Sequence, residues 1–233
     1  MKQIQLSKPG GLENLKLTDT ENPSPKDNEV LLKVHASSLN YHDLMVALGL
    51  IPTKDKRVPL SDAAGEILEV GKDVSKWTVG DKVMSMCFPN WVSGPPKYDL
   101  LSFIGDNQDG YATELISIPE SAITKIPINL NFKEAATLPC AGLTAWRALV
   151  DEGRLKSGET VLVQGTGGVS VFALQLAKTF GATVIATSSS EEKLEKLKSL
   201  GADHLINYKA HPEWGKEVLK ITNNEGVDHV VAV

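Results

Sequence analysis

A glycine-rich turn at residues 165–170, Gly-Thr-Gly-Gly-Val-Ser, constrains this chain more than any other segment. The apolar run Thr160–Val163 before it is typical of a strand, and the apolar residues after it recur at helical spacing. In such a strand–turn–helix unit the first glycine permits a tight turn, the second lets the backbone approach a pyrophosphate, and a small third residue lets helix pack on strand. The helix N-terminus adds free N–H groups and a positive dipole end, so the pattern predicts a dinucleotide site, with a purely structural turn as the alternative. The residues expected at the phosphates are Gly165, Thr166, Gly167, Gly168 and Val169.

The rest of the second half alternates between strand and helix patterns. Thr183–Ala186, His204–Ile206 and Val227–Val233 are predicted strands, and a capping-box pattern at Ser189–Glu192 opens a helix that ends at Gly201. Alternation at these lengths implies right-handed crossovers and a parallel sheet. We therefore expect a doubly wound α/β domain over residues 126–233, and an incomplete one.

The first half, residues 1–125, contains short alternating runs separated by turn-forming residues. The expected strands are Glu29–Ala36, Gly65–Val70, Asp81–Met86 and Tyr111–Ile118, and one helix is expected at Tyr41–Leu48. Several strands at this spacing predict a β barrel or sandwich. From Cys87 to Gly110 the pattern indicates a long surface excursion, whose Trp91 and Tyr98 either cover an apolar substrate or anchor the loop.

The end of the second strand bears on the type of cofactor. NAD-binding folds usually place an acid there to hold the ribose 2′-hydroxyl, but this chain has hydroxyl residues at 187–190 and no acid before Glu191. The absence of that acid, together with Lys193 one turn later, favours NADP(H), with Ser188, Ser189 and Lys193 at the 2′-phosphate. The alternative is that the serines only cap the helix and Lys193 is solvated.

Composition narrows the class of protein. A net charge of −5 and a pI of about 5.6 argue against nucleic acid and anionic membranes as partners. No apolar run approaches the roughly 18 residues of a membrane span, and the polar N-terminus is unlike a signal peptide. We therefore expect a cytoplasmic protein. The two cysteines, Cys87 and Cys140, lie far apart in the sequence and exclude a disulfide framework and a four-cysteine zinc site.

Four segments together resemble the medium-chain dehydrogenase/reductase superfamily, and most of all its zinc-independent branch of quinone oxidoreductases and alcohol-dehydrogenase-like proteins. They are Ser38–Asp43 (Ser-Leu-Asn-Tyr-His-Asp), Asp109–Ala112, Thr137–Trp146 and Val161–Val169. The resemblance implies an N-terminal GroES-like barrel domain followed by a Rossmann domain. It also implies hydride transfer from a nicotinamide to a quinone, enone or carbonyl substrate. Within the family pattern, Thr144 corresponds to a residue at the nicotinamide and Tyr208 to one near the adenosine.

The zinc-ligand positions of the family are altered in this chain. Zinc members have Cys at the position of Asn40 and Gly-His-Glu where Ser61-Asp62-Ala63 stands, and their third ligand falls at Cys140. Because zinc takes Cys, His, Asp or Glu, only two protein ligands would remain. We therefore expect no metal, and Cys140 as a small apolar filler near the cofactor.

Without a Lewis acid, another group must donate to the oxygen on which negative charge grows. The resemblance implies Asn40, Tyr41 and His42 as candidate catalytic residues, with Asn40 facing the nicotinamide and His42 relaying a proton. The alternatives are a turn-forming Asn40 that bonds its own backbone and a His42 without a catalytic role.

Family members run on for roughly another hundred residues, so we expect this chain to be a fragment of a longer protein. Its last apolar strand would then have an uncovered edge, and the complete protein would be a homodimer. The alternative function is an NADPH-binding sensor or structural paralogue without turnover, since one fold hosts many functions.

Overall fold

The computed structural model describes residues 1–91, 93–95, 97 and 102–233, so Tyr98 lies outside the described residues. The chain forms two compact units, Met1–Cys140 and Ala141–Val233. This division falls later in the chain than residue 125, because the short helix α2 (Phe132–Ala135) belongs to the first unit. Its Ala135 packs with Ala64 of that unit in one apolar cluster. In the described part of the chain, no helix is long and apolar enough to cross a membrane.

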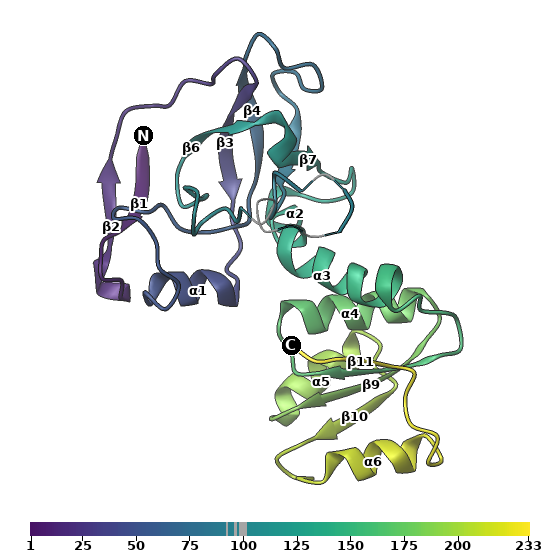
Figure 1. Ribbon diagram of the computed structural model, residues 1–233. Helices are drawn as coiled ribbons and strands as arrows, with labels where there is room; N and C mark the ends of the chain where they lie inside the picture. The colour runs from purple at the N-terminus through teal and green to yellow at the C-terminus, as the bar shows by residue number, and fades with distance from the viewer. Residues whose placement is uncertain (92, 96, 98–101) are drawn as a thin grey trace. The chain divides into compact units, whose positions relative to one another are not determined.

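The first unit is built on a five-stranded antiparallel sheet with the strand order β6-β3-β4-β5-β7 (Figure 1). The strands are β3 (Glu29–Ala36), β4 (Ala64–Val70), β5 (Lys82–Ser85), β6 (Leu115–Pro119) and β7 (Ile123–Lys125). Val30 and Leu32 of β3 are fully buried and lie in the core of this unit with Ile67. The helix α1 (Tyr41–Ala47) follows β3, as the sequence predicted.

The first unit departs from expectation at two places. A separate hairpin of β1 (Lys2–Leu6) and β2 (Leu15–Asp19) was not predicted, because its strands are rich in polar residues. The predicted strand at Tyr111 begins only at Leu115. Tyr111 instead lies in a bend, where its N–H donates to the Leu60 carbonyl at 2.9 Å and its side chain is buried.

The second unit contains the predicted parallel sheet, with the strand order β10-β9-β8-β11. Its strands are β8 (Thr160–Gln164), β9 (Thr183–Ser188), β10 (His204–Asn207) and β11 (His229–Val231). Its helices are α3 (Leu143–Trp146), α4 (Gly168–Thr179), α5 (Glu191–Ser199) and α6 (Trp214–Ile221). A π-helical turn, Arg147–Glu152, continues α3.

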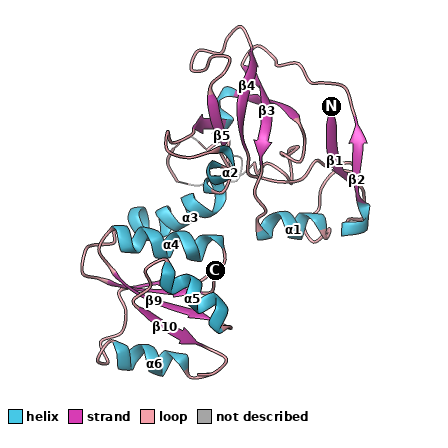
Figure 2. Cartoon of the chain, turned by 180° about the vertical axis from the view of Figure 1, so that it is seen from behind, coloured by secondary structure: helices cyan, strands magenta, loops and turns pink. Residues whose placement is uncertain are grey.

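Helices cover both faces of this sheet, with α4 and α5 on one face and α6 on the other (Figure 2). The alternation of side chains along β8 explains the arrangement, because Val161 and Val163 pack with α4 while Leu162 packs with α6. The predicted α/β class is thus confirmed. Along its described length β11 pairs only with β8, and Val230 is left exposed.

Candidate functional site

The side chain of Asn40 meets Asp62 at one end of the first unit's sheet. Ala36 at the end of β3 pairs with Ala64 at the start of β4, so the residues that follow β3 and precede β4 lie together. The Asn40 amide nitrogen Nδ2 donates to Asp62 Oδ2 at 3.0 Å and to Ser61 Oγ at 3.2 Å. Asn40 is also the N-cap of α1, where its backbone N–H donates to the Asp43 carboxylate at 2.8 Å. Asn40 is therefore both a cap and a link between two loops.

Asp62 is fully buried and accepts hydrogen bonds from several segments. Its Oδ2 accepts hydrogen bonds from the Ser38 hydroxyl at 2.9 Å and from the backbone N–H of Cys140 at 3.4 Å. It also accepts the hydrogen bond from the Asn40 amide. Burial raises the pKa of the Asp62 carboxyl, and the hydrogen bonds from Asn40 and Ser38 offset part of that rise. Burial likewise raises the pKa of Asp43. We call Ser38, Asn40, Asp43, Ser61, Asp62 and the Cys140 N–H the Asn40–Asp62 network.

Zinc members of the family that this sequence resembles hold their metal at three positions. In this chain those positions are Asn40, Asp62 and Cys140, and all three belong to the network. The structure brings Asn40, Asp62 and Cys140 together, but the amide nitrogen of Asn40 points at Asp62 as a donor and has no lone pair for a metal. Within the residues that the structure describes, no three His, Cys, Asp or Glu side chains are placed to hold a metal ion. The residues therefore do not fit a catalytic zinc.

The two cysteines, distant in sequence, meet at this network. Cys87 Sγ lies 3.1 Å from the Pro139 carbonyl oxygen and 3.9 Å from Asp62 Oδ1, and its thiol is hydrogen-bonded to Cys140. This hydrogen bond raises the pKa of Cys87 and lowers the pKa of Cys140. Cys140 thus has polar contacts where the sequence analysis expected an apolar filler, since its partners come from segments that the sequence cannot pair.

Tyr41 and His42 lie in the first turn of α1 with different surroundings. The Tyr41 side chain is exposed. The His42 ring nitrogen Nε2 lies 3.0 Å from Asp106 Oδ2, and the ring is 4.3 Å from that of Phe103, centroid to centroid. The sequence analysis missed Asp106, because an acid in an irregular loop carries no periodic pattern that could reveal it.

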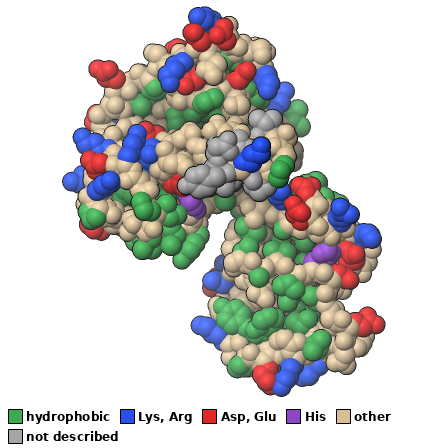
Figure 3. All heavy atoms as spheres, viewed as in Figure 1, with side chains coloured by type: hydrophobic (Ala, Val, Ile, Leu, Met, Phe, Trp, Pro, Cys, Tyr) green, Lys and Arg blue, Asp and Glu red, His purple; other side chains and the backbone are tan. Residues whose placement is uncertain are grey.

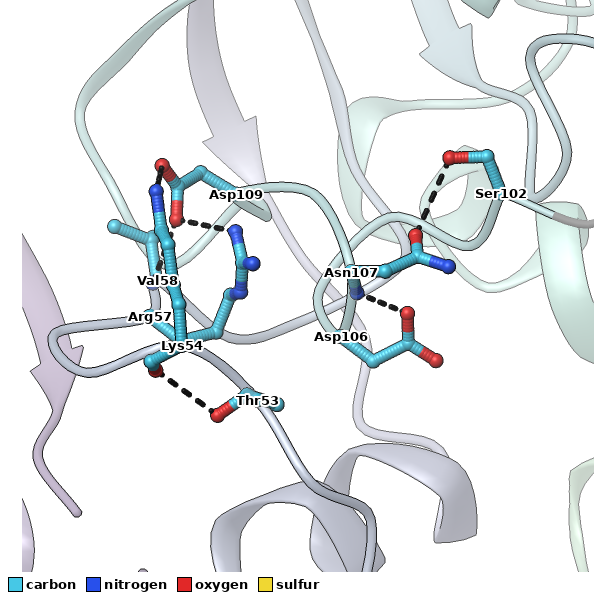
Figure 4. Close-up of polar contacts among 8 residues, drawn as sticks. All are labelled: Thr53, Lys54, Arg57, Val58, Ser102, Asp106, Asn107 and Asp109. Atoms are coloured by element: carbon cyan, nitrogen blue, oxygen red, sulfur yellow. Dashed lines mark hydrogen bonds and ion pairs between the residues drawn. The ribbon is translucent and has the colours of Figure 1, made fainter.

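Ion pairs at Asp109 fix the loop that carries Asp106 (Figure 4). Asp109 accepts from Lys54 at 2.8 Å and from the buried Arg57 at 2.8 Å, and its Oδ1 also receives the Val58 N–H at 3.2 Å. Since Arg57 is buried, these contacts tie the loop firmly to the chain before β4. The pairing between Asp106 and His42 therefore rests on an anchored loop.

Apolar side chains gather at the surface over α1 (Figure 3). The exposed ones are Leu39, Tyr41, Leu44, Leu48 and Leu50. A candidate donor, Tyr41, thus lies among side chains that favour an apolar ligand.

The second candidate site is the glycine loop, residues 165–170, between β8 and α4. Gly165 has φ +80°, a conformation that glycine adopts without strain, and its N–H donates to the Thr187 carbonyl at 3.0 Å. Gly167 is the N-cap of α4 and supplies no side-chain cap, so the N–H groups of the first helical turn remain for a ligand. No atom lies within 4 Å of a Cβ placed on Gly167, so the backbone faces open space. Ser170 closes the loop by donating its hydroxyl to the Gln164 carbonyl at 2.8 Å. These features fit the pyrophosphate of a dinucleotide.

The predicted 2′-phosphate residues Ser188 and Ser189 lie at the carboxyl end of β9, along the edge of the sheet that carries the glycine loop. Ser188 ends β9 and is buried, while Ser189 is half-buried and Lys193 is exposed on α5. The Tyr208 N–H donates to the Ser188 carbonyl at 3.1 Å, which holds Tyr208 beside this strand end.

The start of α5 and the position of Thr144 bear on two of the sequence predictions. The helix α5 begins one residue later than the predicted capping box, because Ser190 rather than Ser189 accepts the Lys193 N–H, at 3.4 Å. Ser189 is therefore not used as the cap. Thr144 lies on an exposed side of α3, the helix that packs against α4.

Two family models match this chain. The alcohol dehydrogenase GroES-like domain matches residues 26–128, and the zinc-binding dehydrogenase domain matches residues 168–233.

The chain is similar to curated proteins along nearly all of its length. It is 46% identical over 229 residues to a zinc-type alcohol dehydrogenase-like protein of Schizosaccharomyces pombe, covering 96% of this chain and 66% of that protein. It is 36% identical to a chloroplast envelope quinone oxidoreductase homolog of Arabidopsis thaliana, covering 95% of this chain and 64% of that protein. The chain thus spans about two thirds of the length of these relatives.

Solved structures agree with these matches. The quinone oxidoreductase of Coxiella burnetii is 33% identical, with a TM-score of 0.79 over 100% of this chain and 68% of that one. The Escherichia coli quinone oxidoreductase complexed with NADPH is 25% identical, with a TM-score of 0.81 over 97% of this chain and 64% of that one. With a GroES-like unit followed by a Rossmann-like parallel sheet, the chain belongs to the medium-chain dehydrogenase/reductase superfamily and is similar to its quinone oxidoreductases.

Proposed function

We propose that this protein transfers a hydride from NADPH to a quinone, enone or carbonyl substrate without a catalytic zinc. The observation that carries the proposal is the Asn40–Asp62 network. Where zinc members of the family hold a metal, the Asn40 amide donates to Asp62 at 3.0 Å. The quinone oxidoreductase relatives support the choice of substrate class.

The second unit would hold the cofactor, which supplies the hydride when bound. The glycine loop would receive the pyrophosphate on the open backbone at Gly167 and the first turn of α4. Ser188, Ser189 and Lys193 would face the 2′-phosphate, since no acid stands among residues 187–190 to repel it. Tyr208 would lie near the adenosine, and Thr144 at the nicotinamide.

The first unit would supply the groups that handle charge and protons. Asn40 Nδ2 already donates to both Asp62 and Ser61, so we assign Asn40 to positioning this network. Tyr41 is exposed and is free to approach a substrate oxygen, while His42 is oriented through its ring nitrogen by Asp106 at 3.0 Å. We assign the Tyr41 hydroxyl to the oxygen that gains negative charge and His42 to proton relay.

A substrate panel tests the proposal. NADPH absorbance is followed with the protein and a set of quinones, enones, aldehydes and alcohols. Consumption with at least one acceptor is expected. Tyr41→Phe and His42→Gln should each lower kcat by about 100-fold, as for the loss of a general acid, while NADPH binding is retained. Lys76→Ala, an exposed site on another loop, is the matched control.

The outcome separates an enzyme from a binding protein. NADPH binding without consumption across the whole panel would overturn the proposal and favour a sensor of the same fold. Zinc-dependent turnover would overturn the metal-free mechanism alone. The expected cytoplasmic location and homodimer stay predictions.

A further inference from the structure

Cys87 and Cys140 form a thiol pair that the proposed reaction does not use. Cys87 lies in a bend just after β5, and Cys140 lies in the π-helical turn Leu138–Gly142. Neither is part of a disulfide. Cys87 Sγ is 3.1 Å from the carbonyl oxygen of Pro139, which shares a peptide bond with Cys140. The hydrogen bond between the two thiols raises the pKa of Cys87 and lowers the pKa of Cys140.

This arrangement suits a disulfide. A disulfide requires the sulfur atoms to close to about 2.05 Å with Cβ atoms about 3.8 Å apart. The Cys87 sulfur already lies 3.1 Å from the carbonyl oxygen of the Pro139–Cys140 peptide, so a local backbone shift can bring the two thiols together. Cys87 is in a bend rather than in a paired strand, so its backbone can shift without breaking sheet hydrogen bonds.

We propose that Cys87 and Cys140 are a modification site that a hydroperoxide converts into an intramolecular disulfide. Cys140 is only partly buried, whereas Cys87 is 6% exposed, so Cys140 meets the peroxide first. Its sulfur attacks the peroxide oxygen, the O–O bond breaks, and an alcohol or water leaves. Cys140 is then a sulfenic acid.

The second step joins the two residues. The Cys87 sulfur attacks the sulfenic sulfur of Cys140, the S–S bond forms, and hydroxide leaves with the Cys87 proton as water. In total the two thiols lose two protons and two electrons, and these reduce one peroxide to an alcohol or water and a further water. A dithiol reverses the change by thiol–disulfide exchange.

The disulfide would also alter the Asn40–Asp62 network. The Cys87 thiol would no longer donate to Pro139 or Asp62, both of which it now contacts. The proposal concerns the thiols themselves and holds whether or not the protein turns over NADPH.

Peptide mapping of the oxidised protein tests the site. The folded protein is treated with hydrogen peroxide, its remaining thiols are alkylated in denaturant, and non-reducing digests are analysed by mass. A peptide that joins residues 87 and 140 is expected, lighter than its reduced parts by two hydrogen atoms and released by dithiothreitol. Three results would overturn the proposal: two free thiols, a disulfide between two chains, or Cys140 oxidised to the sulfinic acid while Cys87 stays a thiol.

Single variants separate the two roles. In Cys87→Ser, Cys140 should lose its resolving partner and accumulate as sulfenic and sulfinic acid. In Cys140→Ser, the buried Cys87 should react at least about tenfold more slowly than the thiols of the wild type. Equal rates for Cys87 in both proteins would show that the pair does not act together. Far-UV circular dichroism checks that each variant folds, and Cys87→Ala replaces Cys87→Ser if it does not.

Discussion

The glycine loop and the Asn40–Asp62 network are built in opposite ways. The loop presents backbone, with an open space above Gly167 and uncapped N–H groups at the start of α4. The network presents buried side chains, with Asp62 fully enclosed by donors from other segments. A site made of backbone can lose its ligand without losing its fold. A site made of buried side chains cannot easily lose one member alone.

Gly167→Val is the sharpest test of the backbone site. A valine side chain would occupy the space into which a pyrophosphate must come, and NADPH affinity should fall at least about 100-fold, or about 2.7 kcal/mol. The free energy of unfolding should change little, because no atom lies within 4 Å of a Cβ at Gly167.

A matched glycine controls for the added side chain. Gly215 on α6 is exposed and likewise has no atom within 4 Å of a Cβ. Gly215→Val should leave NADPH affinity unchanged in a binding titration. If Gly167→Val binds NADPH as the wild type does, the cofactor does not lie on this loop.

Asp62→Ala is the corresponding test of the side-chain site. The change leaves the Asn40 amide, the Ser38 hydroxyl and the Cys140 N–H without their acceptor in a buried place. We expect a loss of about 2 kcal/mol in the free energy of unfolding, measured with urea, with NADPH affinity retained. An unchanged stability would mean that water satisfies these donors and that the network is not needed for the fold.

The two sites also differ in how well sequence reasoning could find them. The glycine loop is local, since strand, turn and helix follow one another within residues 160–180, and its position was predicted correctly. Helix α5 was misplaced by one residue, because Ser189 and Ser190 are equally good caps by residue type.

The network could be predicted only in part. Asn40 and Asp62 were singled out through the family resemblance, but their hydrogen bond depends on the pairing of Ala36 with Ala64. Asp106 and the contact between the two cysteines were missed. Each joins segments far apart in the chain, and no periodic pattern encodes such meetings.

Lys193→Ala tests whether this side chain of the second unit contacts the 2′-phosphate of NADPH. Lys193 is exposed on α5, so its loss should leave the fold intact. The variant should bind NADPH more weakly by about 1–2 kcal/mol, as for one charged hydrogen bond, and NADH almost as before. Lys198→Ala, on the same helix, is the control. Equal losses for both cofactors would show that Lys193 does not contact the 2′-phosphate.

Stability at different pH values tests the burial of Asp62. Its pKa is raised in the folded protein, so folding favours the protonated carboxyl, and this contribution declines as the pH rises through the folded-state pKa. As the pH is lowered from neutrality through the folded-state pKa, the wild type should gain stability relative to Asp62→Asn, by at most about 1.4 kcal/mol per pH unit for one proton. If the wild type instead loses stability relative to Asp62→Asn as the pH falls, a cation must lie beside Asp62.

Metal content and turnover, measured together, test the central claim most directly. The protein is purified without chelator, its zinc is determined by elemental analysis, and NADPH oxidation by a quinone is followed before and after treatment with a chelator. We predict substoichiometric zinc and an unchanged rate, because Asn40 donates to Asp62 where a metal ligand would have to stand. One zinc per chain, with activity lost on chelation and restored by added zinc, would contradict the account.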